Sequence, residues 1–373
     1  MITFIFVSLT EEQYQFLSQM DSAPYTAVSN STNVTCDVYM HLETAKVIFT
    51  LFYIIVFIVG LSGNILALYI TIQKHPKINS TTLYLIHLAV SDALFTLALP
   101  SRIVYIVRGF DWPLGEMPCR IFALLFYINT YVSINFMTWL SIDRYIAMVH
   151  PLRFAKFRKV QNVKYICAAV WVFVFLQTAP LLFIQMTKEN KGLTTCMEYP
   201  NFETNPNLPK ILLGACLLGY CLPVAIIIFC YFRVNVKLCK IAKENPLTEK
   251  LGRNKKAITV ILIVLLAFLI CFTPYHATII QYMIRKLLAP QNCWHQQAFK
   301  MSLQVSVCFM NLNCCIDPLI YFFAFKGYKK KVLEIIRRRI TLSALTSSKT
   351  ISENNSTHAT MSQIQGSASG SAN

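Results

Sequence analysis

Two aspartates lie within apolar stretches of the sequence that are long enough to cross a membrane. Asp92 stands in "HLAVSDALFTLALP" and Asp317 in "NCCIDPLIYFF", each without an adjacent base. A carboxylate at that depth is costly, so it needs polar neighbours, water or a cation. Pro318, next to Asp317, removes a backbone donor and interrupts helical hydrogen bonding. These groups predict a functional polar cluster inside a membrane protein.

A charged pair ends another apolar stretch. Asp143 and Arg144 lie in "SIDRYIAMVHPL", where the chain changes from apolar to basic. The pair could simply reach the membrane surface, or it could act on a partner there. Other polar residues at membrane depth could join Asp92 and Asp317 in one internal cluster. They are Asn64, Asn129, Ser133 and Asn313.

The composition is typical of a membrane protein. Of 373 residues, 55% are hydrophobic and 14% are charged, too little charge to cover a soluble domain of this length. Seven apolar stretches have the roughly 20 residues that a helix needs to cross the hydrocarbon. They are 47–72, 83–107, 121–142, 165–184, 211–232, 257–284 and 301–325. Because membrane barrels show short alternating segments instead, the sequence predicts an all-α membrane protein, a seven-transmembrane helix bundle.

The distribution of bases predicts the orientation. Residues 1–45 contain no Lys or Arg, whereas 23 of the 34 bases follow the first, third, fifth and seventh stretches when the last segment is counted to Arg339. By the positive-inside rule, the N-terminus is outside and the C-terminus inside. We expect an extracellular segment at 1–45, the bundle at 46–325, a short amphipathic helix on the inner leaflet at 326–340 and a disordered cytoplasmic Ser/Thr-rich tail at 341–373. The net charge of +17 then reflects orientation and contact with membrane lipids, not nucleic-acid binding.

Four of the thirteen cysteines fall outside the membrane, in an oxidising compartment. Four cysteines allow three pairings. Cys119 opens the third stretch and Cys196 lies in the loop after the fourth, which favours a Cys119–Cys196 disulfide. Cys36 and Cys293 would then join the N-terminal segment to the third outer loop.

The N-terminal segment also carries modification signals. Sequons at Asn30 and Asn33 lie outside and are expected to carry glycans. Its first residues are apolar but short and lack a basic start, so we do not expect a cleaved signal peptide.

An ordered set of short motifs resembles the rhodopsin-like (class A) G-protein-coupled receptors over residues 46–340. The set comprises Gly63-Asn64, "LAVSD" ending at Asp92, Cys119, Asp143-Arg144-Tyr145, Trp171, Pro223, Tyr231, "CFTP" from Cys271 to Pro274 and "DPLIY" from Asp317 to Tyr321. Single motifs are weak, but the ordered set is highly specific. Two positions depart from the family pattern: Phe272 stands where Trp is usual, and Asp317 where Asn is usual.

This resemblance implies a receptor whose polar core has two arrangements and which acts on a heterotrimeric G protein. It assigns activation and coupling roles to Asp143, Arg144, Tyr145, Tyr231, Phe272, Pro274, Pro318 and Tyr321. The cluster of Asp92, Asn129, Ser133, Asn313 and Asp317 resembles the family's sodium pocket, with a purely structural cluster as the alternative. No cofactor is expected besides that allosteric sodium ion. Arrestin and receptor kinases are expected to act on the phosphorylated tail.

The outer part of the bundle is expected to hold the ligand. Arg102 lies ten residues outward of Asp92, about 15 Å along a helix, where it either reaches the outer headgroups or lines a pocket. Tyr127, Tyr131 and Tyr275 add hydroxyls among apolar side chains, which suits a rigid apolar ligand bearing hydroxyls. Stretches such as "GFDWPLG" and "CMEYPNF" are similar to those of oxysterol receptors in the family. That similarity implies a hydroxylated sterol such as a dihydroxycholesterol, the inhibitory class of G protein and a role in leukocyte migration.

Absent features disfavour other classes of protein. The seventh stretch has no Lys for a retinal Schiff base, and the third has no acid between Cys119 and Asp143 to bind an amine. No Gly-rich phosphate loop, HExxH motif or nucleophile elbow is present, so an enzyme is not expected. A peptide or chemokine receptor stays open, because the N-terminal segment is acidic and carries Tyr25 and Tyr39. A transporter or channel is less favoured, since no inverted repeat is present.

Overall fold

The computed structural model describes residues 42–73, 79–190, 192–197, 208–244, 249–288, 293–324, 328–334, 337–338 and 341. Its long helices are α2 (Leu42–Gln73), α3 (Ser80–Val107), α4 (Glu116–Val149), α5 (Val160–Thr178), α7 (Leu222–Glu244), α8 (Glu249–Leu288) and α9 (Cys293–Asn311). Shorter elements are α6 (Leu208–Cys216), α10 (Asn313–Ala324), the 3₁₀ turns η1 (Ala155–Arg158) and η2 (Ala179–Leu182), the π-helical turn η3 (Leu217–Cys221) and the strands β1 (Thr187–Asn190) and β2 (Leu193–Cys196).

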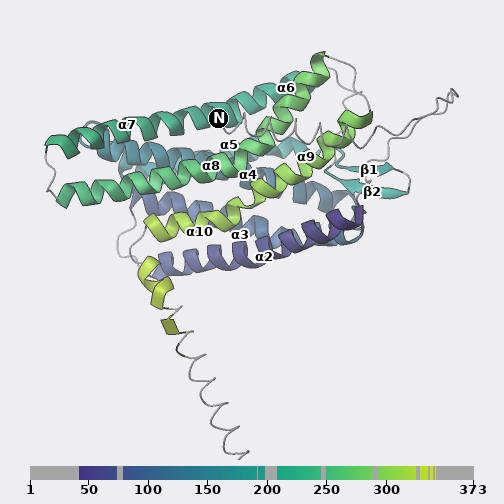
Figure 1. Cartoon of the computed structure of the whole chain (residues 1–373), viewed down its shortest axis with the longest axis horizontal. Coiled ribbons are helices and arrows are strands. Elements are labelled where there is room, and N and C mark those ends of the chain that lie inside the picture. Colours follow the sequence, from purple (N-terminus) through teal and green to yellow (C-terminus); the bar gives the residue numbers. More distant parts are fainter. Residues whose placement is uncertain are drawn as a thin grey trace, which may run out of the picture.

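Seven of the described helical segments are long and apolar enough to cross a membrane, which confirms the predicted bundle. Figure 1 shows them side by side, with the β1–β2 hairpin at one end and the end of α10 at the other. In the most apolar 18-residue segments of α3 and α4, 61% of the residues are buried inside the bundle, against 22% in the fourth span, Val160–Leu182. α3 and α4 therefore lie in the core of the bundle, and α5 lies at its periphery. This is the arrangement expected where lipid, not water, covers the outer faces.

The fourth span ends earlier than predicted. Its helix α5 stops at Thr178, and the chain continues as η2 only to Leu182. The predicted stretch ran to residue 184, which was wrong at this end. Pro180 explains the change, because it has no N–H to donate to the carbonyl four residues before it, while Ala179 itself keeps α-helical dihedral angles.

The fifth and seventh spans contain irregular turns at membrane depth. In the fifth, η3 lies between α6 and α7, just before Pro223, where the missing N–H of the proline favours a wider turn. In the seventh, Leu312 separates α9 from α10, six residues before Pro318. Pro318 lies inside α10, and the carbonyl of Cys314, four residues before it, accepts a hydrogen bond from Asn64 in place of the missing proline N–H. A kink at Pro318 stays a prediction.

The chain beyond α10 is described only in part. Residues 328–334 are helical, and the ring of buried Tyr328 lies 6.3 Å from that of Tyr321. This segment falls within the amphipathic helix predicted at 326–340, whose contact with the inner leaflet stays a prediction.

Candidate functional site

A cavity lies between α2, α3, α4, α8 and α9, beneath the end of β2. Its empty volume is about 470 Å³, open solvent included. Its polar lining consists of Tyr53, Arg102, Tyr127, Tyr275, Gln304 and Asn311, and its apolar lining includes Phe122, Phe126, Met197, Leu303 and Val307. The cavity thus combines a few polar groups with apolar walls, as small-molecule sites do.

Arg102 is the charged residue of this lining. Its side chain is buried, with 7% of the residue exposed, and its Nη2 donates a 2.7 Å hydrogen bond to Oε1 of Gln304. The guanidinium carbon also lies 5.0 Å from the ring centre of Tyr105 and 6.0 Å from that of Tyr53. Arg102 therefore points into the bundle, and the alternative that it reaches the outer headgroups is wrong.

The predicted tyrosines occupy two depths. The hydroxyls of Tyr127 and Tyr275 lie 3.5 Å apart in the cavity lining. Tyr131 is not in that lining, and its ring stacks on Tyr127 with centres 6.5 Å apart. A Cβ added to Gly219 would lie 3.0 Å from the Tyr131 ring, so this tyrosine fills space against the fifth span. A direct ligand contact by Tyr131 stays a prediction.

Sequence reasoning missed a second set of polar residues in the cavity. Gln304 pairs with Arg102, and Nδ2 of Asn311 donates a 3.1 Å hydrogen bond to the hydroxyl of Tyr53. These bonds join α9 to α3 and to α2. The sequence signal for them was weak, because a neutral Gln or Asn in an apolar stretch does not reveal its partner.

The polar cluster lies deeper, between α3, α4 and α10. Nδ2 of Asn129 donates a 2.8 Å hydrogen bond to Oδ1 of Asp92, and the carboxyl of Asp317 faces that of Asp92. Asp92, Ser133, Asn313 and Asp317 are fully buried, and Asn129 is 4% exposed. Oδ2 of Asp92 and both carboxyl oxygens of Asp317 have no hydrogen-bond donor among the described residues. The structure thus brings Asp92, Asn129 and Asp317 together, whereas the membership of buried Ser133 and Asn313 in the cluster stays a prediction.

Asn64 belongs to a neighbouring contact. Its Nδ2 donates hydrogen bonds to the carbonyls of Gly60 and Cys314, at 3.0 and 2.8 Å. Its Oδ1 accepts a 3.4 Å bond from the hydroxyl of Tyr321. Asn64 therefore fastens α2 to the irregular backbone at the start of α10.

Asp143 accepts hydrogen bonds from four donors near the C-terminal end of α4. Its Oδ1 accepts from Oγ of Ser80 at 2.7 Å and from Nε of Arg158 at 3.0 Å. Its Oδ2 accepts from Oγ1 of Thr81 at 3.1 Å and from Nη2 of Arg144 at 2.6 Å. Sequence reasoning predicted the Asp143–Arg144 pair but missed the other three donors.

The remaining residues with predicted activation roles are packed within the bundle. The ring of Tyr145 lies 5.9 Å from that of Phe229, and Tyr231 is half-buried against the core. Phe272 is fully buried, with its ring 5.3 Å from that of Phe268. Pro274 lies inside α8, where its carbonyl accepts a 2.9 Å bond from Oγ1 of Thr278. The change of state that these residues would undergo stays a prediction.

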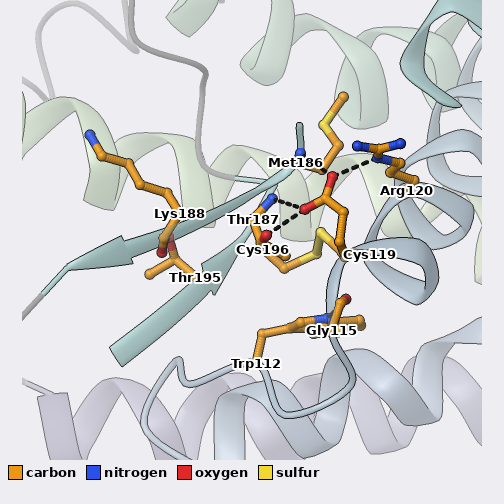
Figure 2. The surroundings of a disulfide bond; sticks show 10 residues. Trp112, Gly115, Cys119, Arg120, Met186, Thr187, Lys188, Thr195 and Cys196 are labelled. Atoms are coloured by element: carbon orange, nitrogen blue, oxygen red, sulfur yellow. Dashed lines mark hydrogen bonds and ion pairs between the residues drawn. A yellow bond between two sulfur atoms is a disulfide. The ribbon is translucent and has the colours of Figure 1, made fainter. Parts of the chain in front are cut away.

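A disulfide and a glutamate hold the hairpin over the cavity. Cys119 and Cys196 are bonded, with Cα atoms 5.8 Å apart, which confirms that predicted pairing. Figure 2 shows Arg120, Met186 and Thr187 near the disulfide. The carboxylate of Glu116 accepts bonds from the backbone N–H groups of Met186 and Thr187 at 2.8 and 2.9 Å. Nε of Arg120 donates a 2.6 Å bond to the same carboxylate. The first turn of α4 thus fixes the chain entering β1.

Several predicted modifications concern residues that the structure does not place. Asn30, Asn33 and Cys36 lie outside the described residues, as does the side chain of Cys293. Glycosylation and the Cys36–Cys293 disulfide therefore stay predictions.

Comparisons with known proteins agree with this geometry. The model of the family described as "7 transmembrane receptor (rhodopsin family)" matches residues 63–321. The chain is 52% identical to mouse G-protein coupled receptor 183 over 341 residues, 91% of this chain and 96% of the relative. It is 53% identical to G-protein coupled receptor 183-A of Danio rerio over 325 residues, 87% of this chain and 88% of the relative.

A viral protein is similar over a shorter range. The chain is 36% identical to the G-protein coupled receptor homolog FPV206 of Fowlpox virus over 278 residues, 74% of this chain and 86% of the relative. Membership of this family implies a non-enzymatic, multi-pass protein of the plasma membrane that binds a small-molecule ligand and acts on G proteins. The chain belongs to the rhodopsin family of seven-transmembrane, G-protein-coupled receptors.

Proposed function

We propose that this receptor binds a hydroxylated sterol, an oxysterol such as a dihydroxycholesterol, and signals through the inhibitory class of heterotrimeric G proteins to direct leukocyte migration. The sterol is supported by the chemistry of the cavity and by the resemblance to oxysterol receptors. The G-protein class and the cellular role rest on that resemblance alone.

The environment of Arg102 is the observation that supports a hydroxylated sterol as the ligand. Within the described residues Arg102 donates a hydrogen bond to the neutral Gln304, and no acid forms an ion pair with it. A guanidinium in such a site stabilises ligand oxygen atoms strongly, because a hydrogen bond to a charged donor is worth about 1.5–3 kcal/mol. The walls around it are apolar, among them Phe122, Phe126 and Val307. A rigid hydrocarbon bearing hydroxyls satisfies both parts of this lining.

Signalling requires a route from the cavity to the inner face. We propose that the N-terminus lies outside the cell. The hairpin with its disulfide then faces the oxidising side, and Arg144 faces the cytoplasm. In this proposal, Arg144 is released from Asp143 on activation and then contacts the G protein. Arrestin and receptor kinases would act on the Ser/Thr-rich tail beyond residue 341.

An allosteric sodium ion at Asp92 is part of the proposal. The described residues contain no group of three or more His, Cys, Asp or Glu that could hold a metal ion, so the ligands would also come from hydroxyl and amide oxygens. The residues fit such a hard cation, because Asp92, Asp317, Ser133 and Asn313 all have buried side-chain atoms without a hydrogen-bond partner among the described residues. The ion would offset one of the two negative charges that two ionised carboxylates would carry at membrane depth.

The test is a ligand screen on cells that express the chain together with a panel of G proteins. A dihydroxycholesterol and a lipid extract should promote nucleotide exchange on the inhibitory class without ion flux. Activation by a protein fraction and not by lipid would replace the sterol with a peptide or chemokine ligand. Ion flux without nucleotide exchange would contradict the receptor mechanism itself.

A further inference from the structure

Asp143 is paired with two arginines that occupy different oxygen atoms. Oδ1 accepts from Arg158, the last residue of η1, and Oδ2 accepts from Arg144, the next residue of α4. Each oxygen also accepts from one hydroxyl of the first turn of α3. The carboxylate side chain is 3% exposed, whereas the side chains of Arg144 and Arg158 are 22% and 32% exposed. One buried anion therefore holds two partly exposed cations.

The neighbouring elements fix this geometry. Oδ1 of Asn79 accepts bonds from the backbone N–H and the hydroxyl of Thr82, at 2.9 and 3.0 Å, and so begins α3 with its first hydroxyls facing Asp143. The backbone N–H of Lys159 donates a 3.3 Å bond to the carbonyl of Lys156, which closes the turn that carries Arg158. Arg158 thus reaches Asp143 from an ordered turn in the loop between α4 and α5.

The sixth span offers Arg144 no alternative acid. The sequence contains no Asp or Glu between Glu249, the first residue of α8, and Asp317. Among the residues that the structure describes, Asp143 is the only acid that forms an ion pair with either arginine. The release of Arg144 therefore depends on how Asp143 is compensated after Arg144 has left.

We propose that Arg158 is a second counter-ion of Asp143 that remains bound when Arg144 moves to the G protein, and that it thereby makes the release of Arg144 less costly. The proposal rests on the coupling role assigned to Arg144 above. With Arg158 in place, Asp143 keeps one guanidinium and two hydroxyl donors after the release. Without Arg158, the release leaves a buried carboxylate with no counter-charge, which is strongly unfavourable. Arg158 is in this sense a positioning residue for coupling.

The direction of the effect follows from the two states. In the resting state Asp143 has two cations, which repel each other across the carboxylate. In the released state it has one. Removing Arg158 strengthens the hold of Asp143 on Arg144 and destabilises the released state, so Arg158→Gln must weaken coupling. If Arg158 instead stabilised the resting state more than the released state, Arg158→Gln would strengthen coupling to the G protein.

The experiment measures binding of a nucleotide-free G-protein heterotrimer to the full-length receptor in nanodiscs without agonist. The heterotrimer is the one on which the parent receptor catalyses most nucleotide exchange. Arg158→Gln should raise the Kd by at least about fivefold, the lower end of usual coupling between sites. Arg158→Lys should raise it less, because the charge is kept and only the planar fork is lost. Lys156→Gln removes the same charge from an exposed residue of η1 and should leave the Kd unchanged.

A second background separates this mechanism from direct contact between Arg158 and the G protein. In Asp143→Asn, Arg158→Gln should change the Kd by no more than about twofold, the scatter expected for independent sites. An equal loss in both backgrounds would show that Arg158 touches the G protein. An unchanged Kd in the parent background would overturn the counter-ion role.

Two controls keep the outcome clear. If Arg158→Gln does not reach the membrane, Arg158→Lys in the two backgrounds gives the same comparison. If Arg144→Ala leaves G-protein binding intact, the assigned role of Arg144 fails. If Arg144→Ala abolishes binding but Arg158→Gln has no effect, only the counter-ion is refuted.

Discussion

Nη2 of Arg102 lies 2.7 Å from Oε1 of Gln304, and this bond joins α3 to α9 across the cavity. The guanidinium is thereby held in place before a ligand arrives, with Tyr105 and Tyr53 on its faces. A ligand hydroxyl can accept from another of the five guanidinium N–H donors while Gln304 holds the group in place. Ligand binding at Arg102 is therefore connected to the position of the seventh span.

Arg102→Ala should weaken binding of a labelled oxysterol by about one to two decades, because a hydrogen bond from a charged donor is lost. Arg102→Lys should restore only part of the affinity, since an ammonium is a point charge and not a fixed fork. Arg108→Ala is the matched control, because that arginine is exposed and pairs with Asp111 at 3.8 Å. Unchanged affinity in both Arg102 variants, measured by saturation binding on cells with normal surface expression, would remove the main support for a sterol ligand.

The bundle and most members of its polar cluster could be predicted from the sequence for a physical reason. Lipid solvent demands about 20 apolar residues per helix, so each carboxylate at that depth stands out against its surroundings. Asp92 and Asp317 were therefore visible without a structure. The same argument identified Arg102 as a pocket candidate but left its direction open, because a long basic side chain can point either way from the same helix position.

Contacts between distant segments could not be predicted in the same way. Gln304 and Asn311 are neutral and lie among apolar residues, so nothing local indicates that they bond to α3 and α2. The break at Leu312 was missed because Pro318 was the stronger local signal. The hairpin depends on Glu116, whose bonds reach about 70 residues along the chain. Long-range pairing of this kind is decided by packing, not by sequence period.

Arg144→Ala should abolish G-protein activation while leaving surface expression and ligand binding nearly intact. Arg144 lies at the inner end of α4, far along the helix from the cavity, and its ion pair is with Asp143 at 2.6 Å. The measurement is nucleotide exchange on the G protein at saturating agonist, with radioligand binding on the same membranes. Normal exchange by this variant would show that Arg144 is not the coupling group.

Gly63→Ala should destabilise the receptor by about 1–3 kcal/mol, the usual cost of overpacking. A Cβ at Gly63 would lie 2.8 Å from Cγ of Pro318 and 3.3 Å from its Cβ, and the proline ring cannot move aside without moving α10. Gly214→Ala is the control, because a Cβ there meets nothing within 4 Å. Thermal unfolding of the purified receptors checks the difference, and equal melting temperatures for the two variants would contradict the close packing of α2 on α10.

Cys119→Ser should impair delivery to the cell surface more than Cys36→Ser. Cys119 and Cys196 are almost fully buried and fasten the hairpin to the start of α4, so their loss frees the chain over the cavity. Surface immunolabelling of intact cells compares the two variants. Glu116→Gln should have an intermediate effect, because the disulfide remains while the hydrogen bonds to β1 weaken. Mass mapping that joined Cys119 to Cys36 would overturn the pairing.

Sodium should lower agonist affinity in the parent receptor and not in Asp92→Asn. The reason lies in the cluster, where the carboxyls of Asp92 and Asp317 face each other and three of their four oxygens have no donor among the described residues. A cation between them stabilises the compact, resting arrangement, and an agonist that favours the other arrangement must bind against it.

The measurement is agonist affinity in sodium and in a large organic cation at equal ionic strength. The parent receptor should show at least about a fivefold difference, the lower end of usual coupling between sites. The variant should show none, since the amide of Asn keeps the shape of the side chain but removes the charge that holds the ion. Thr96→Val provides the control, because its hydroxyl bonds to the carbonyls of Asp92 and Ala93 in the same helix and not to the carboxylate. Equal sodium sensitivity in the parent and in Asp92→Asn would show that the cluster is a structural polar core, in which Asn129 at 2.8 Å and the thiol of Cys314 at 3.6 Å donate to Asp92.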